Sequence, residues 1–364
     1  MNLVLTGPMG AGKTTIGMRV ARALGMEFAD TDSMAEEKSG RTICELFSKD
    51  GEGKFRELEK EIIKDISKKD NLVIAAGGGA VLDPENMRRL RSNGIIVTLE
   101  AAPAVLLERL KGVTDRPLLA VGQNRGTEFG KYLEERAAYY SNTDFRLNTG
   151  KTSIEESVGR LLDIAQLPPI RICGCISGKA PEADIRTAIE SGVSMVELRL
   201  DLIPNPDVKN LVRNCAVPVI ATDRKNKARL KEAIQAGCEF VDIEVDSVEK
   251  DEIIKLARQN GCKVIVSLHD FDGIPNAFPE KGDADLLKIA VTVKTKEDVQ
   301  ELVNLHSHRD DVIIVGMGPH GTPLRLFSPL LGSYLTYCSV RERTAPGQTD
   351  LQTMVRIYRE MGLR

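Results

Sequence analysis

Eight short apolar runs in the second half of the chain limit the folds open to it, and most of them are separated by segments with a helical pattern. The runs are IRICGCIS, MVELRLD, VPVIATD, FVDIEV, KVIVSLHDF, LLKIAVTV, VIIVGMG and LTYCSV. Strands that alternate with helices form parallel sheets, and eight such units in about two hundred residues are typical of a compact (β/α)8 barrel, the TIM barrel. Between SLHDF and LLKIAV, prolines and glycines in IPNAFPEKGDAD leave little room for the expected helix.

The chain has 364 residues, more than one domain usually holds. In IAQLPPIRICGCIS a helical pattern ends at two prolines and a strand-like run begins at about Ile170. We therefore expect one domain over residues 1–167 and the barrel over residues 170–364. In the first domain, strand patterns such as NLVLTG, LVIAAGGG and GIIVTLE alternate with helical ones, which predicts a parallel α/β sheet.

The amino-acid composition limits the classes of partner that the chain can bind. The net charge of −3 provides no basic field for nucleic acid, although local sites for small anions remain open. The seven cysteines include no CxxC pair, which favours reduced thiols over a disulfide framework or a zinc site. No segment has the pattern of a signal peptide or a membrane span. We expect a cytoplasmic protein that acts on small molecules, with no nucleic-acid or membrane partner; a homodimer formed through the barrel is a further hypothesis.

A phosphate-binding loop opens the first domain. GPMGAGKT, residues 7–14, matches GxxxxGK[ST] and lies between a predicted strand and a predicted helix, the context that this motif requires. Backbone N–H groups of such a loop surround phosphates, Lys13 neutralises their oxygens, and the Thr14 hydroxyl can hold Mg²⁺. The pattern predicts a P-loop kinase domain. Its expected nucleotide-binding residues are Gly10, Ala11, Gly12, Lys13, Thr14 and Thr15.

Five further motifs follow in the first domain: DTD, FRELE, GGGAV, DRPLL and EERAAYY. Each has a structural explanation on its own, since an arginine in a charged helix usually faces solvent. Together, in this order and spacing, they resemble shikimate kinase over nearly all of residues 1–165. Gluconate kinases and adenylate kinases share the phosphate-binding loop, but we do not expect this combination of motifs in them.

The resemblance implies ATP and Mg²⁺ as cofactors and shikimate as the phosphate acceptor. Thr14 and, through water, Asp30 would serve the metal ion, while Asp32 would orient the attacking hydroxyl. The segment RLKGVTDRPLLAVGQ would form a mobile lid that carries Arg116 onto the phosphates and Arg109 against adenine, and its closure would exclude water. The carboxylate and ring of shikimate would be held by Arg56, Gly78, Gly79 and Arg136.

Polar residues follow or interrupt the apolar runs of the second half, where a barrel places its chemistry. Lys288 interrupts LLKIAV; burial is costly for an ammonium group and lowers its pKa, so we expect part of the amine to be neutral near pH 7. Each such residue also has a structural reading, for example a lysine at a strand end or a hydrogen-bonded histidine. The set comprises Glu197, Arg199, Arg224, His269, Lys288 and Arg325, with Thr344 and Gln348 in RTAPGQ.

As a set, ELRLD, SLHDF, KIAV and APGQ resemble type I 3-dehydroquinate dehydratase over residues 170–350. The resemblance implies that Lys288 forms a Schiff base with the ketone of 3-dehydroquinate, without an external cofactor. His269 would remove the acidified proton and help the β-hydroxyl leave as water, giving 3-dehydroshikimate. Substrate binding would fall to two groups: Arg325, Thr344 and Gln348 on the carboxylate and ring hydroxyls, and Glu197, Arg199 and Arg224 on the opposite wall.

The chain departs from this family pattern at several positions. A glutamate that pairs with the catalytic histidine is expected about four residues after Arg224, where Ala228 stands instead. Cys175 replaces a serine of the first strand, and TAPGQ replaces SAPGQ. Either Glu244 takes over the support of the histidine or the dehydratase works slowly, and slow dehydration is our expectation.

These resemblances predict a bifunctional enzyme of the shikimate pathway, with a third enzyme needed to reduce 3-dehydroshikimate before the kinase can use it. Two alternatives remain. In one, the barrel is degenerate and only binds metabolites or holds an oligomer together; the missing glutamate supports this reading. In the other, the barrel is a class I aldolase, against which APGQ and the set of arginines argue.

Overall fold

The computed structural model describes residues 1–111, 125–141, 143–166, 170–306 and 311–363. It divides into two compact units, Met1–Leu167 and Pro168–Arg364. Each unit has its own sheet and its own hydrophobic core.

The first unit is built on a five-stranded parallel sheet with the order β2-β3-β1-β4-β5. The parallel α/β sheet predicted from the sequence is thus confirmed. β1 lies at its centre and is fully buried, so the loop that follows it starts from the middle of the sheet. The strands are β1 (Asn2–Thr6), β2 (Glu27–Asp30), β3 (Leu72–Ala75), β4 (Gly94–Glu100) and β5 (Phe145–Asn148).

Helices cover both faces of this sheet because alternate strand residues point to opposite sides. Leu3 and Leu5 of β1 belong to a core with residues of α1, α5, α6 and α7, whereas Val4 belongs to a core with α3 and α4. The elements are α1 (Lys13–Leu24), α2 (Thr31–Ser39), α3 (Ile43–Ile66), the 3₁₀ turn η1 (Ala80–Leu82), α4 (Pro84–Ser92), α5 (Pro103–Arg109), α6 (Arg125–Ser141) and α7 (Ile154–Gln166).

All eight strands predicted for the second unit are present, and they form one parallel sheet with the order β12-β11-β10-β9-β8-β7-β6-β13. The sheet is nearly closed: the Tyr334 N–H, just before β13, donates to the carbonyl of Val312 at the start of β12 over 3.0 Å. The TIM-barrel prediction is confirmed. The strands are β6 (Ile172–Ile176), β7 (Met195–Arg199), β8 (Val219–Thr222), β9 (Phe240–Glu244), β10 (Lys263–Asp270), β11 (Leu286–Thr292), β12 (Val312–Met317) and β13 (Thr336–Ser339).

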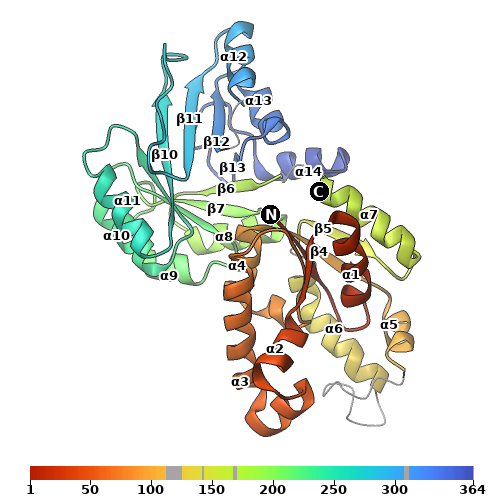
Figure 1. Ribbon diagram of the computed structural model, residues 1–364. Coiled ribbons are helices and arrows are strands. Elements are labelled where there is room, and N and C mark those ends of the chain that lie inside the picture. Colours follow the sequence, from red (N-terminus) through yellow and green to blue (C-terminus); the bar gives the residue numbers. More distant parts are fainter. Residues whose placement is uncertain (112–124, 142, 167–169, 307–310, 364) are drawn as a thin grey trace. The chain divides into compact units, whose positions relative to one another are not determined.

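Helices follow most barrel strands, and α9, α10 and α11 line the outside of the sheet in Figure 1. Residues 271–285, between β10 and β11, contain no helix, which confirms the prediction from their prolines and glycines. The helices are α8 (Pro181–Ser191), α9 (Val208–Arg213), α10 (Lys227–Ala236), α11 (Lys250–Gln259), α12 (Lys296–His306), α13 (Thr322–Phe327), the 3₁₀ turn η3 (Ser328–Leu331) and α14 (Leu351–Glu360).

Inward-pointing side chains fill the barrel interior and set the position of its polar residues. Met195, Phe240 and Leu286 belong to this inner core. Two residues further along each strand, the same face carries Glu197, Asp242 and Lys288. The strand period of two therefore places charged groups directly above an apolar base.

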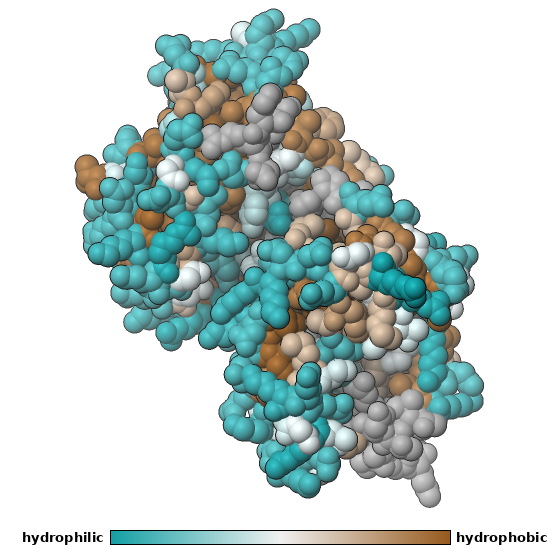
Figure 2. Space-filling view, in the orientation of Figure 1, coloured by the Kyte–Doolittle hydropathy of each residue, from teal (hydrophilic) through white to brown (hydrophobic). Residues whose placement is uncertain are grey.

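Polar and charged side chains cover much of the face of the protein seen in Figure 2. None of the described helices combines the length and apolar character needed to span a membrane.

Candidate active sites

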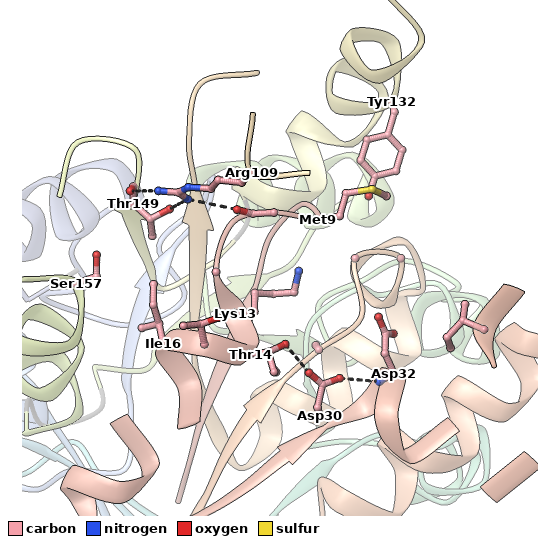
Figure 3. A pocket seen from close by; sticks show the side chains of 18 of the residues that line it. Met9, Lys13, Thr14, Ile16, Asp30, Asp32, Arg109, Tyr132, Thr149 and Ser157 are labelled. Atoms are coloured by element: carbon pink, nitrogen blue, oxygen red, sulfur yellow. Dashed lines mark hydrogen bonds between the residues drawn. The ribbon is translucent and has the colours of Figure 1, made fainter. Parts of the chain in front are cut away.

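The phosphate-binding loop lines a cavity of about 510 Å³ in the first unit. Gly12 precedes α1 with φ of 97° and provides no side-chain cap, so the first N–H groups of the helix are left for a ligand. Lys13 extends into the cavity (Figure 3), and its Nζ donates to the carbonyls of Gly7 and Pro8 over 2.7 and 3.1 Å. Gly10, Thr14 and Thr15 also line the cavity, whereas Ala11 is fully buried. This arrangement can bind phosphate groups through backbone N–H groups and one ammonium.

Thr14 and Asp30 meet at one side of the loop. The Thr14 hydroxyl donates to Asp30 Oδ2 over 2.7 Å, while Asp30 Oδ1 accepts the N–H of Asp32 over 3.0 Å and caps α2 (Figure 3). No group of three metal-ligating side chains occurs in the described part of the chain. A hydroxyl and a carboxylate nevertheless suit Mg²⁺, which usually takes one or two protein ligands together with phosphate oxygens.

Three consecutive glycines allow side chains to approach the opposite wall of the cavity. A Cβ at Gly77 would lie 2.5 Å from Asp32 Oδ1, one at Gly78 would lie 3.1 Å from Tyr132 Oη, and one at Gly79 would collide with the Arg56 guanidinium. Gly78, Gly79, Asp32 and Arg56 all line the cavity. These glycines therefore allow Asp32, Tyr132 and Arg56 to approach the backbone closely, and a larger residue would displace those side chains.

Glu59 is a cavity residue that the sequence reasoning missed. Its carboxylate is 2% exposed and accepts from Arg56 Nη1 over 2.9 Å. Burial raises the pKa of Glu59 to about 7, although Arg56 acts in the opposite direction. The signal was available in FRELE, since Glu59 follows Arg56 by three residues and so shares its helix face.

Three other predicted arginines have different positions. Arg109 lines the cavity and donates to the backbone of Gly10 over 3.3 Å and to that of Thr149 over 2.7 Å (Figure 3). Arg136 does not line it, but its guanidinium lies over the ring of Tyr132, which does, at 4.1 Å from the centroid. Arg116 and most of the predicted lid lie outside the described residues.

A second cavity, of about 320 Å³, lies in the barrel. It brings together every residue predicted for the second site. Those eight lining residues are Glu197, Arg199, Arg224, His269, Lys288, Arg325, Thr344 and Gln348. Their convergence from six strands or adjoining segments is what the barrel topology predicts.

Lys288 is buried but not surrounded by apolar groups alone. Its Nζ donates to Asp242 Oδ2 over 2.9 Å and to Glu197 Oε1 over 3.3 Å, and it lies 4.3 Å from the centre of the Tyr337 ring. Burial acts to lower the pKa of Lys288, but Asp242 and Glu197 outweigh it and raise that pKa above its ordinary value. The prediction that part of the Lys288 amine is neutral near pH 7 is therefore wrong for the protein without substrate, because two carboxylates stabilise the ammonium.

Asp242 was not predicted as a site residue, although it contacts two cations that line the cavity, Arg224 and Lys288. It is fully buried, accepts from Ser267 Oγ over 2.6 Å and pairs with Arg224 Nη1 over 3.2 Å, besides its bond to Lys288. Burial opposes its ionisation, but Arg224 and Lys288 hold the pKa of Asp242 well below its usual range. The signal was the alternation in FVDIEV, which puts Asp242 on the same strand face as Glu244.

Glu244 contacts the predicted catalytic histidine. His269 Nδ1 lies 3.0 Å from Glu244 Oε1, and Arg224 Nη1 lies 2.5 Å from the same oxygen. Ala228, by contrast, is exposed in the first turn of α10. These contacts favour the reading in which Glu244 supports the histidine over the reading in which the histidine is unsupported.

Arg325 also lines this cavity. Arg325 is 1% exposed and donates to the carbonyls of Gly316 and Pro346 over 2.8 and 3.1 Å, but it contacts no carboxylate of the described chain. Burial lowers the pKa of Arg325 to about 10. Gln348 is nearby in the same cavity and donates to Cys175 Sγ over 3.1 Å. A buried cation without a counter-charge is suited to a substrate carboxylate.

Comparisons with known proteins match the two units separately. The family model for shikimate kinase matches residues 9–166, and the one for type I 3-dehydroquinase matches residues 172–364. The first unit is 44% identical over 155 residues to a shikimate kinase of Caldanaerobacter subterraneus, covering 43% of this chain and 90% of the relative. It is 45% identical over 163 residues to the enzyme of Caldicellulosiruptor saccharolyticus, covering 45% and 94%.

Among solved structures, the 3-dehydroquinate dehydratase of Aquifex aeolicus is similar at a TM-score of 0.47 and 23% identity, covering 52% of this chain and 98% of that one. The two family matches meet near the boundary between the structural units. The chain therefore belongs to the shikimate kinase family through its first unit and to the type I 3-dehydroquinase family through its second, and it is a bifunctional enzyme of the shikimate pathway, both kinase and lyase.

Proposed function

We propose that the first unit transfers a phosphoryl group from ATP to a hydroxyl of shikimate, with Lys13, Thr14, Asp30 and Asp32 as its central residues. The observation that carries this assignment is the single cavity in which the phosphate-binding loop faces Asp32, Arg56 and Gly79. Mg²⁺ held near Thr14 and Asp30 would supply positive charge to the phosphate oxygens. Lys13 would leave the loop carbonyls that it contacts and bind phosphate oxygens instead.

On the acceptor side, Asp32 would accept a hydrogen bond from the attacking hydroxyl and orient it toward the phosphate. Arg56 would bind the shikimate carboxylate. In the structure it is paired with Glu52 and Glu59, both at 2.9 Å, so the substrate has to compete with these carboxylates. Arg136, whose guanidinium already lies on Tyr132 at the edge of the cavity, would provide the second cation.

We propose that the second unit dehydrates 3-dehydroquinate through a Schiff base at Lys288. The observation that carries this assignment is a buried lysine in one cavity with a histidine and a buried arginine. Arg325 would hold the substrate carboxylate and so direct the ketone toward Nζ. Thr344 and Gln348, which are joined by a 2.7 Å hydrogen bond from the Thr344 N–H, would hold ring hydroxyls.

Lys288 has to lose a proton to solvent before it attacks, because the contacting carboxylates of Asp242 and Glu197, whose own pKa values are lowered, are too weakly basic to take it. The neutral amine then adds to the ketone, and loss of water from the adduct gives an iminium. The iminium draws electron density from the adjacent carbon, and His269 removes a proton there. His269 then returns that proton to the departing β-hydroxyl, which leaves as water, and hydrolysis of the imine releases 3-dehydroshikimate and restores Lys288.

The product of the second site is still a ketone, so a separate reduction must precede phosphorylation at the first site. We place both activities in the cytoplasm, in keeping with seven cysteines that form no disulfide with one another.

Two assays on the purified chain test these assignments. With ATP, Mg²⁺ and shikimate, we expect ADP and a phosphorylated product; with 3-dehydroquinate alone, we expect the absorbance of a conjugated enone. Phosphorylation without any enone would favour a degenerate barrel that only binds metabolites. His269→Ala serves as the matched control, because it should abolish the enone signal and leave phosphorylation intact.

A further inference from the structure

Tyr337 lies directly against the lysine of the barrel cavity. It comes from β13, is 3% exposed and lines the cavity together with Cys175 and Glu197. The centre of its ring is 4.3 Å from Lys288 Nζ, within the range of a cation–π contact. None of the roles proposed above uses this residue.

The hydroxyl of Tyr337 has no hydrogen-bond partner among the described residues, although it is buried. Other buried tyrosines differ: Tyr140 donates to the carbonyl of Gly78, and Tyr358 donates to that of Leu326, each over 2.7 Å. A buried donor without a partner costs free energy, and a phenylalanine would fill the same space without that cost. The unpaired hydroxyl in a substrate cavity therefore indicates a partner that the substrate supplies.

We propose that Tyr337 is a further catalytic residue of the dehydratase, whose hydroxyl donates a hydrogen bond to the substrate oxygen on the carbon that Lys288 attacks. The proposal rests on the Schiff-base function proposed above. When the amine of Lys288 adds, a C–N bond forms, the C=O π bond breaks and negative charge develops on this oxygen. The oxygen is two bonds from Nζ, and Nζ lies over the Tyr337 ring, so the oxygen forms close to that residue.

Tyr337 is suited to donate throughout the reaction rather than to lose its proton. Burial raises the pKa of its hydroxyl well above the ordinary value, and Glu197 nearby acts in the same direction. The donated bond would stabilise the oxygen as it is protonated to a hydroxyl, which then leaves as water while the C=N bond forms. The proton for that departure comes from another group, such as His269, and Tyr337 stays neutral.

Tyr337→Phe separates the hydroxyl from the ring, since the ring contact with Lys288 remains. The full chain is mixed with 3-dehydroquinate, quenched with borohydride after set times, and analysed for the reduced adduct on the peptide that contains Lys288. We expect adduct formation to be slower by about ten- to a hundredfold in Tyr337→Phe, with kcat reduced and KM little changed. Tyr334→Phe is the matched control: it alters a tyrosine three residues earlier that does not line the cavity, and it should trap at the wild-type rate.

Each outcome bears on a different claim. If wild-type protein turns over but yields no adduct on Lys288, the Schiff-base assignment fails and the role of Tyr337 fails with it. If wild-type protein traps at Lys288 and Tyr337→Phe traps equally fast, only the role of Tyr337 is refuted. A purely structural hydroxyl would change the melting temperature of Tyr337→Phe without changing its trapping rate, and that combination also refutes the proposal.

Discussion

Replacing Glu244 by glutamine removes one negative charge from the support of His269 while keeping the size of the side chain. Glu244 Oε1 lies 3.0 Å from His269 Nδ1, and the two side chains are 27% and 23% exposed. In the proposed mechanism His269 gains a proton from the iminium, so its positive charge develops next to this carboxylate. Arg224, which also contacts Glu244, keeps its contacts with Asp242 at 3.2 Å and with Ser267 at 3.0 Å.

The size of the effect follows from the kind of bond that is lost. A hydrogen bond to a charged group contributes about 1.5–3 kcal/mol. Because the side chains of Glu244 and His269 are partly exposed, we expect their hydrogen bond not to exceed this range. Because about 1.4 kcal/mol changes a rate tenfold, a loss of about 2–3 kcal/mol in the transition state lowers kcat by about 30- to 150-fold. KM should change little, since Arg325 and Arg224 remain in place to bind the substrate.

The rate is followed by the enone absorbance of 3-dehydroshikimate over a range of 3-dehydroquinate concentrations, so that kcat and KM are separated. Ala228→Glu is the companion variant. It restores a carboxylate at the position where the family pattern has one, but with Glu244 already on the histidine we expect less than a threefold change. If Glu244→Gln keeps the wild-type kcat while His269→Ala abolishes turnover, this account of the histidine is wrong; a large gain in Ala228→Glu would instead show that the histidine lacked support.

Three further predictions concern the rest of the chain. Lys13→Ala and Asp32→Ala should each abolish phosphorylation of shikimate and leave dehydration intact, and full kinase activity in both variants would refute their assignment. Glu59 has a pKa of about 7 in the folded protein, against an ordinary value of 4.5. Between these two values the folded state keeps a proton that the unfolded chain releases. The free energy of unfolding should therefore fall by about 3 kcal/mol as the pH rises from 4.5 to about 7. Urea unfolding at pH 4 to 8 should show this dependence on pH in the transition of the first unit of wild type and lose it in Glu59→Gln, whereas equal slopes in the two proteins would contradict the raised pKa. Residues 1–167 and 170–364, expressed separately, should each fold and keep their own activity, and two inactive halves beside an active whole chain would count against independent units.

Local patterns in the sequence were sufficient for the fold and for most of the barrel site. Apolar runs of strand length predicted all eight barrel strands, because a strand buried on both faces needs an unbroken apolar stretch. The barrel topology then brings the polar residues at the strand ends together at one face, whatever the lengths of the individual helices and loops. The prolines and glycines of residues 271–285 similarly predicted the missing helix.

Contacts between distant segments could not be predicted in the same way. The sequence could offer the pairing of Glu244 with His269 only as one of two alternatives, because it depends on the register of β9 against β10, where Glu244 lies opposite Ser267, two residues before the histidine. The motifs DTD and FRELE do not show how deeply Glu59 is buried, so its raised pKa could not be predicted from them. Burial and register are set by the packed sheet as a whole rather than by any one motif.

Lys288 illustrates why these long-range contacts matter for chemistry. Its apolar flanks predicted an amine made neutral by burial, but its two carboxylate partners lie 46 and 91 residues earlier in the chain and hold it as an ammonium. They oppose the deprotonation that must precede attack. In the proposed mechanism the iminium carries its positive charge on the same nitrogen, so Asp242 and Glu197 would stabilise that intermediate as well. On that mechanism the arrangement would disfavour only the brief neutral amine and would favour the cationic imine from which the α-proton is removed.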